Sequence, residues 1–242
     1  MGSSSDEGDT RTAELPPESA SLPRAVDYPF LAPLERYVFA TTEVLPAFSI
    51  EARKPVLALG SNAAPQQLRR KLAAIPGHIP ISRAVLFDHV VVYSAHFTRY
   101  GALPATLHAH PGAIAFVAIT WLDERQLTRM HETESVGINY DYREIADVRL
   151  EHDAGQDDAI IPADVRVGAY VSRYGPLLHQ ERPIRLAETA SSGCPLPALT
   201  QPAALRVAQR RVAPDLAFGD FLERLTADEA FRRDCSSRLR AH

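Results

Sequence analysis

The sequence predicts an α+β fold in which most strands precede most helices. Apolar runs typical of strands are concentrated between residues 55 and 188, and apolar residues at helical spacing dominate after Thr200. The chain has 242 residues, of which 45% are hydrophobic. A chain of this length can bury a sizeable core without disulfide or metal cross-links, and it often forms a single domain.

Composition divides the chain into a domain and its flanking segments. Residues 1–27 combine Ser, Glu, Asp, Thr and Pro with few apolar residues, which is the composition of a disordered tail. Residues 28–54 contain enough apolar side chains to pack as an appendage, to which the sequence assigns no role. We expect the domain to span 55–205, with C-terminal helices over 206–242 packed on it.

The first predicted unit is a strand, a tight turn and a helix over 55–72. A short apolar run is followed by a Gly-Ser-Asn turn and then by leucines at helical spacing. Ser61 or Asn62 is expected to cap this helix through its side chain, and Pro65 is tolerated in the first turn.

Three strands are predicted next. The segment 84–94 is rich in β-branched residues, 105–110 alternates, and 113–122 is the most apolar run of the chain. Pro111-Gly112 predicts a turn between the second and the third of them. The run 113–122 is therefore expected to be a central strand.

After these strands the sequence predicts one helix, further strands and then the late helices. A helix is predicted over 123–134, with acidic residues in its first turn. Further strands are predicted at 140–151, 165–173 and 184–188. Thr200 with Pro202 indicates the start of one late helix, and Thr226 with Glu229 matches a capping box for the last helix.

Charge and composition exclude several classes of protein. The net charge is −4, so no basic surface is expected for nucleic acid, and only Lys54 and Lys71 among the 26 basic residues are lysines, a skew that we attribute to codon bias. The longest apolar run is about half of what a membrane-spanning helix needs. Cys194 and Cys235 are too far apart for a CxxC site. The N-terminal residues carry no signal-peptide pattern, and we expect a cytoplasmic location.

Two candidate sites have stronger structural explanations. His108 and His110 share one face of a strand and, with His131 or a carboxylate, are a candidate metal site, but no acidic ligand follows at a fixed spacing. We therefore expect no metal. Ser61 follows a strand, as a nucleophile does in G-x-S-x-G, but the second glycine is missing and a capping role is favoured. Backbone N–H groups of this turn can nevertheless bind a carboxylate or a carbonyl oxygen.

The end of the 123–134 helix carries two glutamates, Glu132 and Glu134. A carboxylate at the C-terminal end of a helix opposes the helix dipole, which suits a general base, whereas composition alone also allows a solvated helix end. Met130 lies one turn before Glu134 and predicts that Glu134 faces inward. Glu132 is about 200° away around the axis and is expected to face solvent.

Four segments of the chain occur in a characteristic order. They are LGSN (59–62), ATLHAHPG (105–112), the strand and helix of 113–135 leading to INYDYREIADV (138–148), and ETASSGCPLPAL (188–199). This order resembles the gamma-glutamylcyclotransferase-like family, which carries a Y-G-S-N-L loop, a strand ending in "atl.p.pG", an "L..LD..EG" segment with a following tyrosine, and a late "GA...gLP..Y" segment. The resemblance covers roughly residues 55 to 205.

The resemblance implies roles for individual residues. It implies Glu134 as the catalytic acid/base. It implies the following substrate-binding residues: Leu59, Gly60, Ser61, Asn62 and Tyr140. The chain departs from the family at Leu59, where the family has tyrosine, at Ala63, where it has leucine, and at the late tyrosine, which is absent.

The resemblance also implies a fold and an activity. The fold is a small mixed β-barrel surrounded by helices. The activity is that of a cyclotransferase that converts a γ-glutamyl amide or a related small amide into 5-oxoproline and an amine, without metal or cofactor. The alternatives are a catalytically inactive binding or scaffold protein on the same fold and a hydrolase of small amides. A small-molecule substrate is expected, with no nucleic-acid or membrane partner; the oligomeric state is not predicted.

Overall fold

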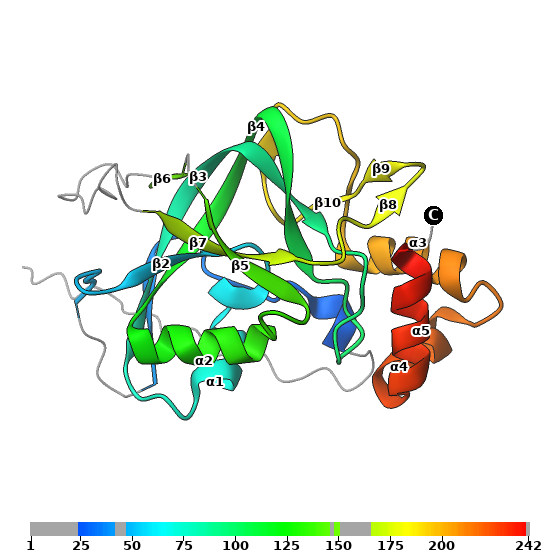
Figure 1. Cartoon of the computed structure of the whole chain (residues 1–242), viewed down its shortest axis with the longest axis horizontal. Coiled ribbons are helices and arrows are strands. Elements are labelled where there is room, and N and C mark those ends of the chain that lie inside the picture. The colour runs from blue at the N-terminus through cyan, green and yellow to red at the C-terminus, as the bar shows by residue number, and fades with distance from the viewer. Residues whose placement is uncertain (1–23, 42–46, 146–147, 151–165, 241–242) are drawn as a thin grey trace, which may run out of the picture.

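The computed structural model describes residues 24–41, 47–145, 148–150 and 166–240. It has the predicted α+β class, with one large mixed sheet and helices packed at two positions around it. Figure 1 shows α1 and α2 together beneath the sheet and α3, α4 and α5 grouped at one end of the molecule. In the described ranges, no helix has both the length and the apolar character needed to cross a bilayer.

The elements have the following bounds. The strands of the large sheet are β1 (Tyr37–Ala40), β2 (Lys54–Ala58), β3 (His78–Tyr93), β4 (Ala105–Leu122), β5 (Tyr140–Ile145), β6 (Val148–Leu150), β7 (Val167–Ser172), β10 (Arg185–Leu186), β11 (Ser191–Ser192) and β12 (Ala198–Leu199). A separate hairpin consists of β8 (Leu178–His179) and β9 (Arg182–Pro183). The helices are η1 (Arg24–Asp27), η2 (Ser61–Ala63), α1 (Pro65–Leu72), α2 (Glu124–Glu134), α3 (Gln201–Val212), α4 (Phe218–Ala227) and α5 (Glu229–Arg240).

The large sheet is open. Its strands follow the order β12-β10-β3-β4-β2-β7-β5, and β1, β6 and β11 pair with β3 or β4 outside this path. β5 pairs with β7 as far as Ile145, whereas β6 begins at Val148 and pairs with β3. In the described residues the sheet is therefore not closed into the small barrel that the resemblance implies, because the ladder on β7 does not continue into β6.

The strand β4 is continuous across Pro111-Gly112, where the sequence predicts a turn. The pairing register with β3 shifts between Phe87 and His89. At this irregularity the Gly112 N–H donates to Asp88 Oδ1 at 2.7 Å. The predicted turn is wrong because proline, which has no N–H, and a glycine with φ of 80° fit a bulge between two regular ladders.

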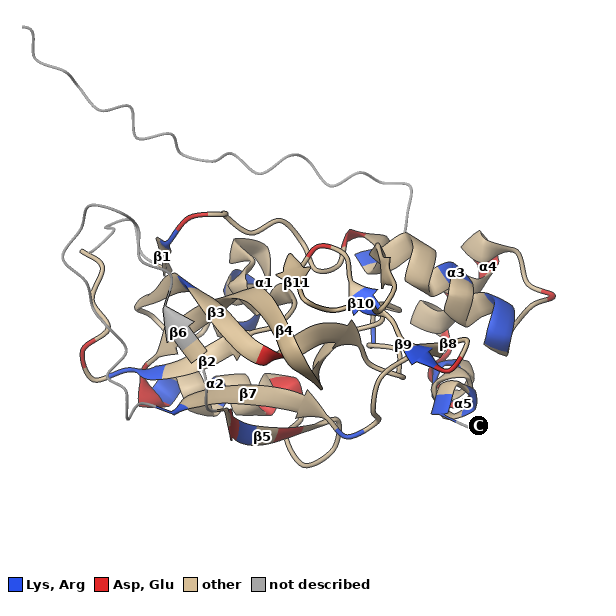
Figure 2. Ribbon diagram, turned by 90° about the horizontal axis from the view of Figure 1, so that it is seen from above, with Lys and Arg blue, Asp and Glu red and all other residues tan. Residues whose placement is uncertain are grey.

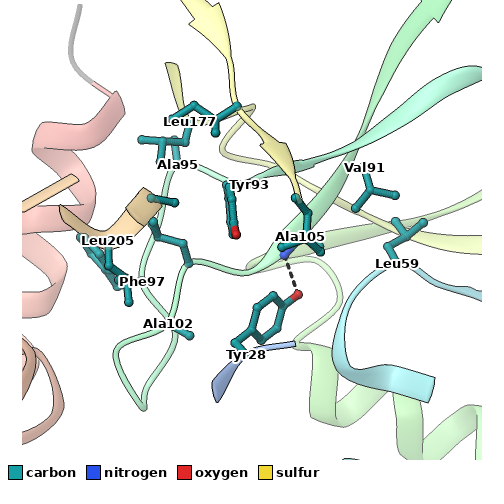
Figure 3. Close-up of a cluster of buried hydrophobic side chains, with 14 of the residues drawn as sticks. Tyr28, Leu59, Val91, Tyr93, Ala95, Phe97, Ala102, Ala105, Leu177 and Leu205 are labelled. Carbon is teal, nitrogen blue, oxygen red and sulfur yellow. Dashed lines mark hydrogen bonds between the residues drawn. The ribbon is translucent and has the colours of Figure 1, made fainter. Parts of the chain in front are cut away.

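The N-terminal boundary differs from the one expected at residue 27. Residues 1–23 lie outside the described residues, but η1 places Ala25 fully inside the main core. Tyr28 is also buried, and its hydroxyl accepts a hydrogen bond from the Ala105 N–H at 2.7 Å (Figure 3). Ala25 of the expected tail and Tyr28, the first residue of the expected appendage, thus both pack in the main core with the first residue of β4.

We expect Tyr28→Phe to lower the free energy of unfolding by about 1 to 3 kcal/mol, because it leaves the buried Ala105 N–H without its acceptor. Denaturant unfolding of the variant checks this expectation. Tyr142→Phe is the matched control, since the Tyr142 hydroxyl makes no hydrogen bond to a described residue. Equal stability of the two variants would show that the Tyr28 hydroxyl contributes nothing.

The C-terminal helices share the main hydrophobic core with the sheet. Leu205 of α3, Phe221 of α4 and Cys235 of α5 are buried in the same cluster as the sheet residues. The expected boundary at 205/206 falls inside α3. The capping box predicted for the last helix is wrong: Thr226 lies within α4, and Asp228 accepts the N–H of Phe231 at 2.9 Å at the start of α5.

Candidate active site

A cavity of about 1110 Å³ lies between the segment that follows β2, the end of α2, the start of β5 and one face of α5. Its walls include all six site residues expected from the sequence: Leu59, Gly60, Ser61, Asn62, Glu134 and Tyr140. The sequence places these residues on separate elements, and the fold brings them to one cavity.

The centre of the site is a hydrogen-bonded group of Glu134, Lys71 and Asn62. Glu134 Oε1 forms an ion pair with Lys71 Nζ and accepts a hydrogen bond from Asn62 Nδ2 at 2.9 Å. Lys71 Nζ also donates to Asn62 Oδ1 at 2.7 Å. Both contacts to the carboxylate use Oε1, and Oε2 makes no hydrogen bond to a described residue. One carboxylate oxygen is therefore held while the other is left for a ligand.

Helix geometry explains why Glu134 faces the cavity. Asp123 and Gln126 form a capping box that starts α2, and Ser135 ends the helix with φ of 52°. The Glu134 side chain is 12% exposed, whereas Glu132 is 58% exposed and pairs with Arg129 at 2.7 Å. The orientation predicted from helical spacing is therefore the one found in the structure.

The side chains of the loop do not cap a helix, contrary to the sequence expectation. Ala64 precedes α1, and neither η2 nor α1 has a side-chain cap. The Asn62 side chain instead forms hydrogen bonds with Glu134 and Lys71. Ser61 Oγ accepts a hydrogen bond from Gln67 Nε2 at 3.2 Å. The short η2 turn still leaves the first N–H groups without partners inside the turn.

Gly60 is required by close packing inside the protein. Its φ is −136°, which other residues also adopt, so the backbone conformation does not require glycine here. A Cβ at this position would overlap the Tyr28 hydroxyl and lie 2.7 Å from the ring carbon that carries it. Tyr28, which lies outside the loop, thus brings a tyrosine hydroxyl against Gly60.

We expect Gly60→Ala to lower the free energy of unfolding by about 1 to 3 kcal/mol, because the added methyl forces the Tyr28 ring to move. Thermal or denaturant unfolding measures the change. Gly219→Ala is the control, since a Cβ there meets no atom within 4 Å and the helix gains about 0.5 to 1 kcal/mol. A fully stable Gly60→Ala protein would contradict the packing described here.

Buried tyrosines surround the carboxylate. Burial raises the pKa of Tyr140 well above its ordinary value, and the negative charge of Glu134 adds to the shift. Burial likewise raises the pKa of Tyr28 and of Tyr100. These phenols therefore remain protonated at neutral pH and can serve as hydrogen-bond donors to a ligand.

No protein-family model matches the chain, and no curated protein matches it. An uncharacterized protein from Homo sapiens is 15% identical, with a TM-score of 0.38, over 73% of this chain and 88% of that chain. A gamma-glutamyl cyclotransferase is 15% identical, with a TM-score of 0.37, over 72% and 87%. The chain is similar to a gamma-glutamyl cyclotransferase.

One wall of the cavity comes from α5, which lies beyond the segments that carry the resemblance. Arg232, Ser236 and Arg240 follow one another at helical spacing along this wall. Figure 2 shows the basic colouring of α5 at the same end of the molecule as α3 and α4. The cavity therefore has a carboxylate on its α2 side and guanidinium groups on its α5 side.

The sequence did not point to three residues of the site, Lys71, Tyr28 and His96. Lys71 is one of two lysines in the chain, and this rarity, which we attributed to codon bias, was the available signal. Tyr28 and His96 carry no motif. His108 and His110 lie on β4 and are not part of the cavity wall. In the described ranges, no three His, Cys, Asp or Glu side chains are grouped as metal ligands.

Proposed function

We propose that the chain is a cyclotransferase that acts on a γ-glutamyl amide or a related small amide and releases 5-oxoproline and an amine. The observation that carries this proposal is the Glu134 carboxylate, which is held through Oε1 by Lys71 and Asn62 and has Oε2 free at a cavity. A held carboxylate with one free oxygen is the arrangement that general acid/base catalysis requires.

The reaction balances with one carboxylate. Glu134 takes a proton from the substrate α-ammonium, and the resulting amine attacks the side-chain carbonyl carbon to close a five-membered ring. The protonated Glu134 then gives its proton to the leaving nitrogen, and the bond from the carbonyl carbon to that nitrogen breaks. The ring nitrogen, which carries two protons after the attack, loses one of them to the released amine, which leaves as an ammonium ion. Because the attack is intramolecular, a cavity that holds the folded conformer supplies much of the catalytic advantage by orientation.

Lys71 and Asn62 support this cycle by fixing the carboxylate. Two partners on Oε1 restrict rotation of the side chain, so that Oε2 keeps its direction during both proton transfers. The N–H groups at the start of η2 and the protonated hydroxyl of Tyr140 are the donors proposed for the oxyanion that develops at the carbonyl.

The test is incubation of the purified chain with a set of γ-glutamyl amides, followed by measurement of 5-oxoproline. Release of 5-oxoproline supports the proposal. Release of free glutamate would instead identify a hydrolase. Absence of turnover together with binding of the amides would identify an inactive binding protein on this fold.

A further inference from the structure

His96 is a buried histidine that lines the same cavity and has no role in the chemistry described above. It lies just after β3, and the residue is 6% exposed. Its ring packs against the rings of Tyr140 and Tyr174, with centroid distances of 5.8 and 4.7 Å. The negative charge of Glu134 also raises the pKa of Tyr140. His96 is therefore close to the part of the cavity where the carboxylate acts.

A chain of hydrogen bonds ends on one nitrogen of this ring. The Tyr174 backbone N–H donates to Ser172 Oγ at 3.1 Å. Ser172 Oγ lies 2.6 Å from Ser94 Oγ, and Ser94 Oγ lies 2.8 Å from His96 Nδ1. Ser94 is completely buried, so water cannot supply a different partner for its hydroxyl.

Two directions are possible for this chain, and the first leads toward the His96 ring. Ser172 accepts from Tyr174 and donates its own proton to Ser94, which in turn donates to His96 Nδ1. In the opposite direction, Ser172 would accept two hydrogen bonds, and its own proton would find no acceptor among the described residues. Each direction leaves one donor without a partner among the described residues. In the first it is the His96 Nε2–H, on a residue of the cavity wall where a ligand can accept it, and in the second it is the Ser172 hydroxyl, on a residue that does not line the cavity. The first direction therefore fits a ligand site, with Nδ1 as the acceptor and the ring proton on Nε2.

The other ring nitrogen belongs to a residue that lines the cavity and is unpaired among the described residues. No hydrogen bond joins His96 Nε2 to a described residue, whereas His96 is part of the cavity wall. Burial lowers the pKa of His96 to about 3, and the positive charge of Arg240, which stacks on Tyr174 at 4.6 Å, adds to the shift. Burial also raises the pKa of the facing Tyr140, so this phenol provides no negative charge to favour an imidazolium.

We propose that His96 is a catalytic residue whose Nε2–H, fixed by the Ser172-Ser94 relay, donates a hydrogen bond to the carbonyl oxygen of the ligand. The assignment of that oxygen to a γ-glutamyl amide rests on the proposed function. A neutral donor transfers no proton in this role. It stabilises negative charge on the oxygen during ring closure, while Glu134 performs both proton transfers.

The tautomer can be measured without any turnover. ¹⁵N NMR of the imidazole nitrogens is expected to show His96 protonated at Nε2 and unchanged between pH 8 and pH 5. His89 is an internal reference for the opposite tautomer, because its Nδ1 lies 2.9 Å from the Phe87 carbonyl oxygen, which only accepts. A proton on Nδ1 of His96 overturns the inference whether or not the chain is an enzyme.

The ligand contact is tested with 5-oxoproline and with variants. Addition of 5-oxoproline is expected to shift the His96 Nε2 resonance. His96→Asn, which keeps a polar group near Ser94 and loses the distal donor, should lower kcat by about 10²-fold with a smaller change in KM. His96→Gln, which places an amide N–H near the Nε2 position, should retain more of kcat. Ser94→Ala keeps the ring and should allow the Nδ1–H tautomer to appear.

The outcomes separate the two proposals. If no γ-glutamyl amide yields 5-oxoproline, the proposed function fails, and the NMR tautomer with the response to 5-oxoproline still decides the role of His96. If 5-oxoproline is released and His96→Asn retains the wild-type kcat, the function stands and the donor role of His96 is wrong. An Nε2 resonance that 5-oxoproline leaves unchanged also counts against the donor role.

Discussion

Glu134→Gln should lower turnover of a γ-glutamyl amide by about 10²-fold or more, because the amide keeps the size of the side chain and removes its ability to exchange a proton. The partners on Oε1 can still contact the amide oxygen, so substrate binding should largely survive. Steady-state release of 5-oxoproline and ligand titration of the same preparation measure the two effects separately.

Glu132→Gln is the matched control on the same helix. This side chain is 58% exposed and pairs with Arg129 outside the cavity, so its loss should change turnover little. An inactive Glu132→Gln protein, or a Glu134→Gln protein with wild-type turnover, would show that the catalytic carboxylate has been misassigned.

Lys71→Met should lower the free energy of unfolding by about 3 kcal/mol or more, because it leaves the Glu134 carboxylate buried without its counter-charge. The side chains of Lys71 and Glu134 are 9% and 12% exposed, so water compensates poorly for the lost partner. Denaturant unfolding of the variant at neutral pH measures this loss. Lys54→Met, at the exposed first residue of β2, is the control and should cost much less.

The double variant Lys71→Met/Glu134→Gln distinguishes an ion-pair effect from a packing effect. Removing both charges eliminates the unpaired group, so the double variant should be more stable than the sum of the single losses predicts. Strictly additive losses would mean that Lys71 stabilises the protein through its aliphatic stem and not through its charge.

The direction of Glu134 could be predicted from local sequence, because helical periodicity fixes the relative directions of nearby side chains. The spacing from Met130 to Glu134 placed both on the inner face of α2, and the structure agrees. The partner of Glu134 could not be predicted in this way. Lys71 lies 63 residues earlier on another helix, and only the packing of α1 beside α2 brings the two together.

The strands also show which features local sequence predicts and which depend on tertiary pairing. Apolar runs predicted most of the strands, but Pro111-Gly112 was assigned to a turn, because the same residue pair fits a turn and a bulge. In the structure, β3 pairs with β4 on both sides of Pro111-Gly112, so these two residues form a bulge. The open sheet likewise depends on whether β6 pairs with β3 or continues the β7 ladder, which no local pattern encodes.

By itself, the sequence determined the α+β class, the inward face of α2 and the residues that make up the loop at 59–62. These features depend on periodicity and composition, which act over a few residues. Only the tertiary structure decided that Lys71 neutralises Glu134, that Tyr28 packs against Gly60 and that α5 closes the cavity. Such contacts join residues that are far apart in the chain, and they form because burial of the shared hydrophobic core brings the elements together.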